Sequence, residues 1–362
     1  MDTIARVWGR IQATLFPHLE WCLPEPLTDK QRQLAAILEI LRVEQAVPRP
    51  PWRGRPQCDR GALARAFVAK AFYNLPTTAL LVDLLHSQPN LRRLCGFERR
   101  GQVPSAATFS RAFAEFAASG LLDRVLEQLA RQHFDGELVG HIVRDSTAIA
   151  AREKPQPPPP AEPRQPRRMG RPPRGSEPAP FPLTRLQRQV AQSPEEACAE
   201  LWTGCGRGCK RDSKGRPQYW VGYKAHLDVT DDMVPVSMLT TSAQVHDSQV
   251  AIPLAKLSAR RVTALYELMD KAYDAEPIYQ VARDLGHVPV IARNRHTAKR
   301  PELDPAKKQR LQARSAVERA FARLEDEFGG QQVRVRGHPK VHAHLMFGVL
   351  VLFADQLLKL MT

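Results

Sequence analysis

Two aspartates stand where apolar, strand-like runs end, and both have the chemistry of metal ligands. Asp145 follows the run "LVGHIV" (138–143) after one arginine, and Asp270 closes the run "ALYELM" (264–269). Taken alone, each is typical of a helix cap or a turn. If the two strands are neighbours in one sheet, the carboxylates lie side by side and repel unless a cation neutralises them. The pair therefore predicts a divalent metal site, with Asp274 as the less favoured alternative for the second position because it falls beyond the strand end.

A predicted helix supplies a third carboxylate. The stretch "RSAVERAFARLEDEF" (314–328) carries an apolar stripe at helical spacing, made of Val317, Phe321, Leu324 and Phe328. Arg314, Glu318 and Glu325 form a second stripe about 100° round the helix, at the border of the core. We expect Glu318 to be the third metal ligand and Arg314 to orient it or to contact a phosphate. A simple i,i+4 ion pair between Arg314 and Glu318 is the alternative.

The elements that must position these residues form a mixed sheet flanked by helices. Strands are predicted at 137–145, 219–229, 234–243, 264–270 and 287–293, and helices at 247–257, 275–286 and about 309–328, before a C-terminal apolar helix. In the second strand, Lys224, His226 and Asp228 share one face and apolar residues share the other. Asp247 is predicted to cap the helix that follows. Three strands followed by alternating helices and strands indicate an α/β catalytic domain over 137–362.

Residues 1–136 predict a separate all-helical domain, which we expect to bind DNA. The stretch "LTDKQRQLAAILEIL" opens with a capping box of Thr28 and Gln31. Another stretch, "PSAATFSRAFAEF", begins at the predicted cap Ser105. It then aligns three phenylalanines on one helix face: Phe109, Phe113 and Phe116.

The charge of the chain favours a polyanionic partner. The net charge is +15, mostly from arginine, which indicates nucleic acid, although a compositional bias toward arginine and proline is the alternative explanation.

The six cysteines are irregularly spaced, which fits a reducing compartment. The longest apolar run, 345–354, is too short to span a bilayer, and the N-terminus lacks a signal-peptide pattern. We expect a cytoplasmic, nucleoid-associated protein with no membrane partner.

A proline- and arginine-rich insertion separates the first two predicted strands. It covers about 153–183, continues as polar, Gly-rich sequence to 218, and is expected to be extended and mobile. Its centre, "RRMGRPPRG" (167–175), is similar to an AT-hook that fits a narrow minor groove. A charged linker is the alternative. The candidate DNA contacts here are Arg168, Arg171 and Arg174.

From about 137 to 355 the chain resembles the catalytic domain of DDE-type bacterial insertion-sequence transposases. The resemblance is carried by "RDSTAI", "YWVGYKAHLDV", "LTTSAQVHDSQ", "LYELMDKAYDA", "RSAVERAFARLEDEFGG" and "VRVRGHPKVHAHLMFGVL", and "PSAATFSRAF" is similar to the family's N-terminal domain. The resemblance implies an RNase-H-like fold, with Asp145, Asp270 and Glu318 as the catalytic carboxylates.

What the resemblance implies for function is metal-dependent DNA transposition. Two Mg²⁺ ions, with Mn²⁺ as a substitute, would act in hydrolysis at the transposon ends and then in transfer of the freed 3′-OH into target DNA. The partners would be double-stranded terminal repeats and target DNA, bound by a homodimer or larger assembly. An RNase-H-like nuclease without joining activity is one alternative. A catalytically silent, transposase-derived DNA-binding regulator is another.

Two positions depart from the family's helix motif, which has Tyr, Arg, Glu and Lys on one face. Leu311 stands for the Tyr and Glu325 for the Lys. This leaves the metal ligands intact and bears on the DNA contacts of the helix, where Glu325 either faces DNA or pairs with an arginine such as Arg334 or Arg336. Together with Arg314, Lys224 is a further DNA-binding candidate.

A zinc site at the cysteines is a weaker hypothesis. Cys205 and Cys209 are separated by three residues, with Cys198 upstream and His226 downstream. This spacing differs from the usual C-x2-C, so free thiols are favoured.

Overall fold

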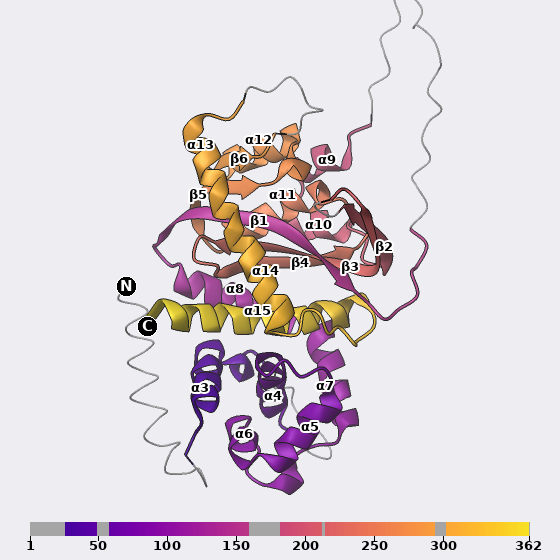
Figure 1. The fold of residues 1–362 in the computed structure, drawn as a ribbon, viewed down its shortest axis with the longest axis vertical. Coiled ribbons are helices and arrows are strands. Elements are labelled where there is room, and N and C mark those ends of the chain that lie inside the picture. The colour runs from indigo at the N-terminus through magenta and orange to yellow at the C-terminus, as the bar shows by residue number, and fades with distance from the viewer. Residues whose placement is uncertain (1–25, 49–57, 159–181, 212–213, 294–301, 362) are drawn as a thin grey trace, which may run out of the picture.

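The computed structural model describes residues 26–48, 58–158, 182–211, 214–293 and 302–361. Within these ranges, helices of the N-terminal part lie on one side of a long C-terminal helix, and a mixed sheet lies on the other (Figure 1). The predicted arginine contacts in the insertion, Arg168, Arg171 and Arg174, lie outside the described residues.

The N-terminal part is helical, as expected. Its helices are α3 (Asp29–Leu41), α4 (Arg60–Phe72), α5 (Thr78–Ser87), α6 (Pro89–Leu94), α7 (Ala106–Ala118) and α8 (Leu121–His133), with short 3₁₀ turns η1 (Val43–Gln45) and η2 (Arg100–Gln102). The capping box of Thr28 and Gln31 begins α3, as predicted. Ser105 precedes α7 but makes no side-chain capping hydrogen bond. The three phenylalanines of α7 are buried, which confirms the core stripe.

The sheet has six strands: β1 (Leu138–Ala150), β2 (Gly206–Arg211), β3 (Pro217–Thr230), β4 (Pro235–Ser242), β5 (Thr263–Met269) and β6 (Val288–Ile291). They run in the order β2-β3-β1-β5-β6, and β4 also pairs with β3. The pairs β1–β3, β2–β3 and β3–β4 are antiparallel, whereas β1–β5 and β5–β6 are parallel. This mixed sheet confirms the expected RNase-H-like α/β architecture.

Two strands differ from the expectation. β1 does not end near residue 145 but continues to Ala150, because its second half pairs with β3 after β5 has ended. β2 was not predicted, since "GRGCKR" has no β-branched or aromatic residue. It forms by pairing with the beginning of β3, where a Cβ on Gly208 would come within 2.2 Å of the Trp220 ring.

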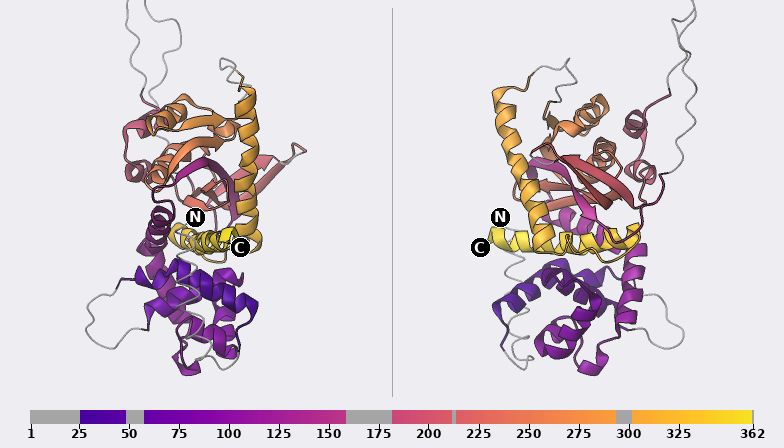
Figure 2. Two further views of the ribbon diagram at one scale, coloured as in Figure 1. Left: turned by 90° about the vertical axis from the view of Figure 1, so that its left-hand side faces the viewer. Right: turned by 45° about the vertical axis from the view of Figure 1, so that its right-hand side comes forward.

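Helices cover both faces of the sheet, as the two views in Figure 2 show. One face carries α9 (Arg185–Ala191), α10 (Pro194–Ala199), α11 (Ser248–Ala259) and α12 (Glu276–Asp284), the last of these preceded by the turn η3 (Lys271–Tyr273). The other face carries α13 (Pro305–Arg310), η4 (Leu311–Arg314) and α14 (Ser315–Asp326). The single helix expected at about 309–328 is therefore divided by a tighter 3₁₀ turn.

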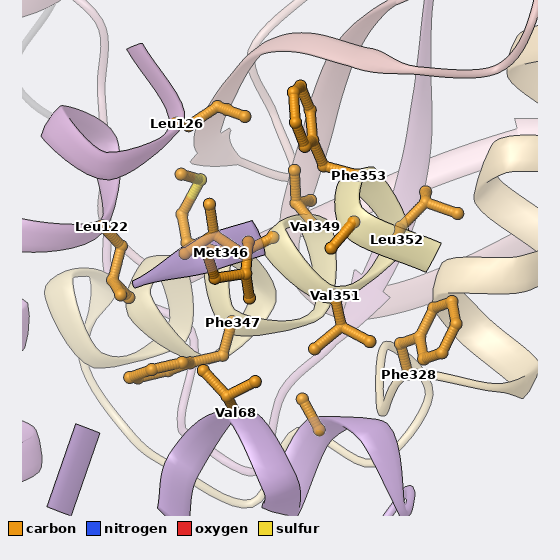
Figure 3. Packing of buried hydrophobic residues seen from close by; sticks show 14 of the residues in the cluster. Val68, Leu122, Leu126, Phe328, Met346, Phe347, Val349, Val351, Leu352 and Phe353 are labelled. Atoms are coloured by element: carbon orange, nitrogen blue, oxygen red, sulfur yellow. The ribbon is translucent and has the colours of Figure 1, made fainter. Parts of the chain in front are cut away.

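The C-terminal helix α15 (His338–Met361) packs against both the N-terminal helices and the sheet. Figure 3 shows its side chains meeting Val68 of α4 on one side and Leu122 and Leu126 of α8 on another. By length and composition this helix is apolar enough to cross a membrane, but 89% of the apolar window is buried inside the protein. It acts as a core helix, in one hydrophobic cluster that includes the N-terminal helices, α14 and β1.

Candidate active site

Asp145 and Asp270 lie beside each other on neighbouring parallel strands. In the β1–β5 register, Ile142 pairs with Glu267 and Val143 with Leu268. Continuing this register by two residues brings Asp145 next to Asp270. Both side chains then point to the same face of the sheet, because side chains alternate along a strand. Asp145 lies inside β1 and not at its end, at the point where β5 stops and leaves that side of β1 open.

Hydrogen bonds fix the two carboxylates. Asp145 Oδ1 accepts the backbone N–H of Ser146 at 2.8 Å, and Asp145 Oδ2 accepts a hydrogen bond from Arg314 Nη2 at 2.9 Å. Asp270 begins η3, and its Oδ1 accepts the backbone N–H of Ala272 at 2.7 Å. The backbone thus determines how each carboxylate is oriented.

The surroundings of Asp145 disfavour its charge. Its side chain is only 22% exposed. Burial raises the pKa of Asp145 above its ordinary value and the nearby charge of Asp270 adds to this, while the hydrogen bonds from Ser146 and Arg314 act in the opposite direction. The charge of Arg314 therefore does not fully compensate the negative charges of Asp145 and Asp270. An additional cation between the two carboxylates would lower their repulsion.

Glu318 lies one helical turn after Arg314, on α14. Its side chain is exposed and forms no hydrogen bond or ion pair with another described residue. No three His, Cys, Asp or Glu side chains within the described ranges gather as a metal-binding group. The expectation that all three carboxylates converge is therefore not met here. Arg314 instead supplies the positive charge beside Asp145.

Glu325 and Arg314 both face β1, as their common stripe predicts. Glu325 Oε1 accepts a hydrogen bond from Thr147 Oγ1 at 2.6 Å, two residues beyond Asp145 on the same face of the strand. Glu325 forms no ion pair with Arg334 or Arg336 within the described structure. This face of β1 is therefore bounded by Arg314 just before α14 and by Glu325 near the end of that helix.

Lys224 lies on the opposite face of the sheet and is already engaged. Its Nζ donates to Asp247 Oδ1 at 2.9 Å and to the Val245 carbonyl at 3.0 Å. Its predicted contact with DNA would require this ion pair to open. Asp247 occupies the N-cap position of α11, as predicted, but its side chain makes no capping hydrogen bond. It pairs with Lys224 because the side chains of β3 alternate and the even-numbered ones face α11.

The same opposite face holds a buried ionic network that the sequence did not reveal. Arg144 donates to both carboxylate oxygens of Asp228, at 2.8 and 2.7 Å, and to Glu267 at 3.1 Å. His287 Nδ1 lies 2.7 Å from Glu267. Burial alone would lower the pKa of Arg144, but Asp228 and Glu267 raise it above its ordinary value. The polar face predicted for β3 is therefore internal rather than solvated.

The remaining candidates are Asp274 and the cysteines. Asp274 follows η3, and its Oδ1 is 3.4 Å from the Tyr279 hydroxyl. Cys205 is buried, whereas Cys209 is exposed on β2. Among the described residues, no group of three potential metal ligands forms at these cysteines.

Two protein-family models match the chain. Residues 198–354 match the transposase DDE domain, and residues 25–115 match a transposase domain designated DUF772. The first match includes Asp270 and Glu318, and Asp145 precedes it. Searches of curated proteins and of solved structures gave no match. Proteins with this DDE domain act on DNA and generally use divalent metal ions. The helical transposase domain followed by the DDE domain is the typical architecture of these elements, and the chain belongs to the DDE-type insertion-sequence transposases.

Proposed function

We propose that this transposase cleaves DNA at transposon ends and joins the freed 3′-OH to target DNA, with Asp145, Asp270 and Glu318 as its catalytic carboxylates. The observation that carries the proposal is the pairing of β1 with β5, which makes Asp145 and Asp270 neighbours on the face beneath α14. Family membership supports the DNA substrate.

The donor set fits a divalent cation. Carboxylate oxygens are the ligands that Mg²⁺ prefers, and Asp145 and Asp270 offer them side by side. We propose two Mg²⁺ ions, replaceable by Mn²⁺, held by these residues and by Glu318, whose exposed side chain is free to turn toward the pair. When bound, such ions stabilise the attacking and leaving oxygens of an in-line phosphodiester displacement.

The residues of the chain orient the reaction. The N–H groups of Ser146 and Ala272 hold the two aspartates in fixed orientations, which lowers the cost of arranging them at the moment of reaction. Arg314 must release Asp145 Oδ2 before that oxygen becomes a ligand, and its guanidinium then becomes available to a DNA phosphate.

The proposed chemistry has two displacements. Water attacks the phosphodiester at the transposon end and the 3′ oxygen leaves as a hydroxyl. That hydroxyl next attacks a target phosphodiester, so one bond between phosphorus and oxygen forms as another breaks, and no nucleotide cofactor is needed.

The proposed setting is the bacterial cytoplasm and its nucleoid. The net charge of +15 supports binding of double-stranded DNA, with residues 1–136 as the principal DNA-binding domain. Synapsis of two transposon ends requires two active sites, so we propose a homodimer or larger assembly on DNA.

A cleavage and joining assay tests the proposal. DNA carrying the element's ends is incubated with Mg²⁺, and both nicked products and joined products are measured. Joined products that disappear in an Asp270→Asn variant support the proposal. Cleavage without joining would assign a nuclease instead, and DNA binding without cleavage would assign a silent regulator.

A further inference from the structure

A basic pocket lies where the N-terminal helices meet the segment that leads into α15. It encloses about 310 Å³ between α4, α5 and α7 on one side and residues 334–347 on the other. Four of its described lining side chains are cationic and none is acidic. The four cations are Lys70, Arg334, Arg336 and Lys340.

These cations are not neutralised within the described structure. None of the four side chains forms an ion pair or hydrogen bond with another described residue. Burial, and then the charge of Arg334, lower the pKa of Lys70 to about 8. Burial and Lys70 likewise lower the pKa of His344, another lining residue, to about 4, so His344 stays neutral. Positive charge is thus concentrated here without an acidic partner among the residues that the structure describes.

A purely structural role explains only part of this cluster. Lys70 lies in the last turn of α4, where a cation complements the helix dipole. Arg334 and Arg336 lie on no helix. They alternate with Val333, which is buried, and Val335, which is partly buried, so both arginines extend from the same side of an extended segment. Their convergence on Lys70 is not required by the packing of that segment.

The remaining lining is suited to an anion. Thr78 and Ser110 offer hydroxyl donors, and the aromatic rings of Phe67, Phe113 and Phe347 form an apolar floor. An apolar floor lowers the local dielectric and strengthens attraction between a bound anion and the cations. Arginine forks match the oxygens of a phosphate particularly well.

We propose that the basic pocket binds a backbone phosphate of DNA, at a place separate from the carboxylate pair. This rests on the proposed function only in requiring that the protein binds DNA. Arg314, just before α14, contacts Asp145, whereas Asp326 at the other end accepts a hydrogen bond from Asn74, which follows α4. A helix of this length, 12 residues, spans roughly 18 Å. The pocket therefore lies toward the C-terminal end of α14, whereas the carboxylate pair contacts Arg314 at its beginning.

The test measures binding of a duplex DNA oligonucleotide in EDTA, at several salt concentrations, without cleavage. The variant Arg334→Gln/Arg336→Gln should bind roughly 10-fold more weakly or worse. The slope of log K against log[salt] should become shallower by about 0.9 for each phosphate that the variant no longer neutralises. The matched control is Arg283→Gln, an exposed arginine on α12 that pairs with Glu276, outside the pocket and outside residues 1–136, which should leave the slope unchanged. Equal slopes for the wild type and the double variant would overturn the proposal.

A second variant keeps the test independent of folding defects. Lys70→Arg retains the charge, and the pKa of arginine lies far above the range tested. The pKa of Lys70 is about 8 without DNA, and a bound phosphate would raise it. The DNA affinity of the wild type should therefore fall as the pH rises from about 8 toward the raised pKa of the complex. Lys70→Arg should bind with little change over this range. An identical pH profile for the two proteins would contradict a phosphate contact at Lys70.

Competition separates the possible sources of phosphate. If inorganic phosphate stabilises the wild type against heat at low millimolar concentration, and the double variant keeps the wild-type salt slope for DNA, the pocket serves a small anion and the DNA assignment is wrong. If the wild type binds no DNA, the proposed function fails with it. If the wild type binds DNA and the pocket variants bind it with the same affinity and salt slope, the pocket proposal fails and the proposed function stands.

Discussion

Arg144 and Asp145 are adjacent in sequence but belong to opposite faces of the sheet, and the two faces differ in almost every physical respect. Arg144 is 1% exposed and shares its charge with Asp228 and Glu267 in a closed network. Asp145 is partly exposed, lies beside a second carboxylate and has one arginine as counter-ion. One face balances its charges internally, and the other leaves an excess of negative charge open to a ligand.

The contrast between the two faces indicates how a buried charge can be assigned to structure or to function. A buried ion that has all its partners contributes to a specific fold, and removing one partner is costly. Burial raises the pKa of Asp145 and of Asp228 alike, so the number of partners and the exposure, not the pKa, distinguish the two faces. Neighbouring residues of one strand can therefore have unrelated roles, and substitutions on each face can separate those roles.

The largest expected effect is on cleavage. Replacing Asp145 or Asp270 by Asn, or Glu318 by Gln, should reduce Mg²⁺-dependent cleavage on the order of 10³-fold or more, because charge stabilisation in the transition state is lost. DNA binding in EDTA should stay within about threefold of the wild type. Asp274→Asn is the control and should cleave normally. The second ligand would be reassigned if Asp274→Asn were inactive and Asp270→Asn active.

The opposite face should respond in stability. Arg144→Met removes the guanidinium that the buried Asp228 and Glu267 share, and should lower the free energy of unfolding by about 3–5 kcal/mol. Urea denaturation measures this directly. Arg100→Gln, which removes an exposed arginine, should change stability by less than about 0.5 kcal/mol. A similarly small change for Arg144→Met would show that the network is not a structural requirement.

A smaller effect is expected at Glu325. The variant Glu325→Lys loses the hydrogen bond from Thr147, at a cost of about 1 kcal/mol in stability. It places a cation near the carboxylate face, so end-DNA affinity should rise by roughly 1–2 kcal/mol. Thr147→Val removes the same hydrogen bond without adding charge and should leave affinity unchanged. Equal or weaker DNA binding by Glu325→Lys would show that this position does not approach DNA.

The smallest expected effect is on the pH dependence of stability, through the carboxyl group of Asp145. The pKa of Asp145 is raised in the folded protein, so between the unfolded value, about 3.9, and the raised value the folded state binds more protons than the unfolded state. The stability of the wild type therefore falls as pH rises through this window. Asp145→Asn lacks this loss and should be at least as stable as the wild type at pH 7. In urea titrations, the difference in the free energy of unfolding between this variant and the wild type should shrink toward pH 4. If the variant were clearly less stable than the wild type at pH 7, the pKa of Asp145 would not be raised in the folded protein.

Much of the fold followed from local patterns. The capping box at Thr28, the phenylalanine stripe of α7, the alternation of β3 and the apolar stripe of α14 each arise from residues within one or two turns or strand repeats. Such patterns determine which element forms and which side of it is buried, because both depend on periodicity along the chain. The candidate carboxylates were likewise chosen by their position relative to these elements.

Other features depended on partners far away in sequence. β1 reaches Ala150 because β3 is there to pair with it, and β2 exists only as a partner of β3. The ion pairs of Arg144 and Lys224 join residues on different strands and helices. The basic pocket combines α4 with a segment more than 260 residues later, so no local signal marks it.

The amino-acid sequence by itself determined most of the helices and strands, the transposase family and the identity of the carboxylates to be tested. The tertiary structure alone decided that β5 lies parallel to β1 and that Arg314 donates a hydrogen bond to Asp145. It also decided that no three His, Cys, Asp or Glu side chains gather as a metal-binding group within the described residues. The physical reason is that hydrophobic periodicity is a short-range property of the chain. Strand order, register and ion pairing are set by contacts between distant segments, and burial decides which charges those contacts leave without a partner.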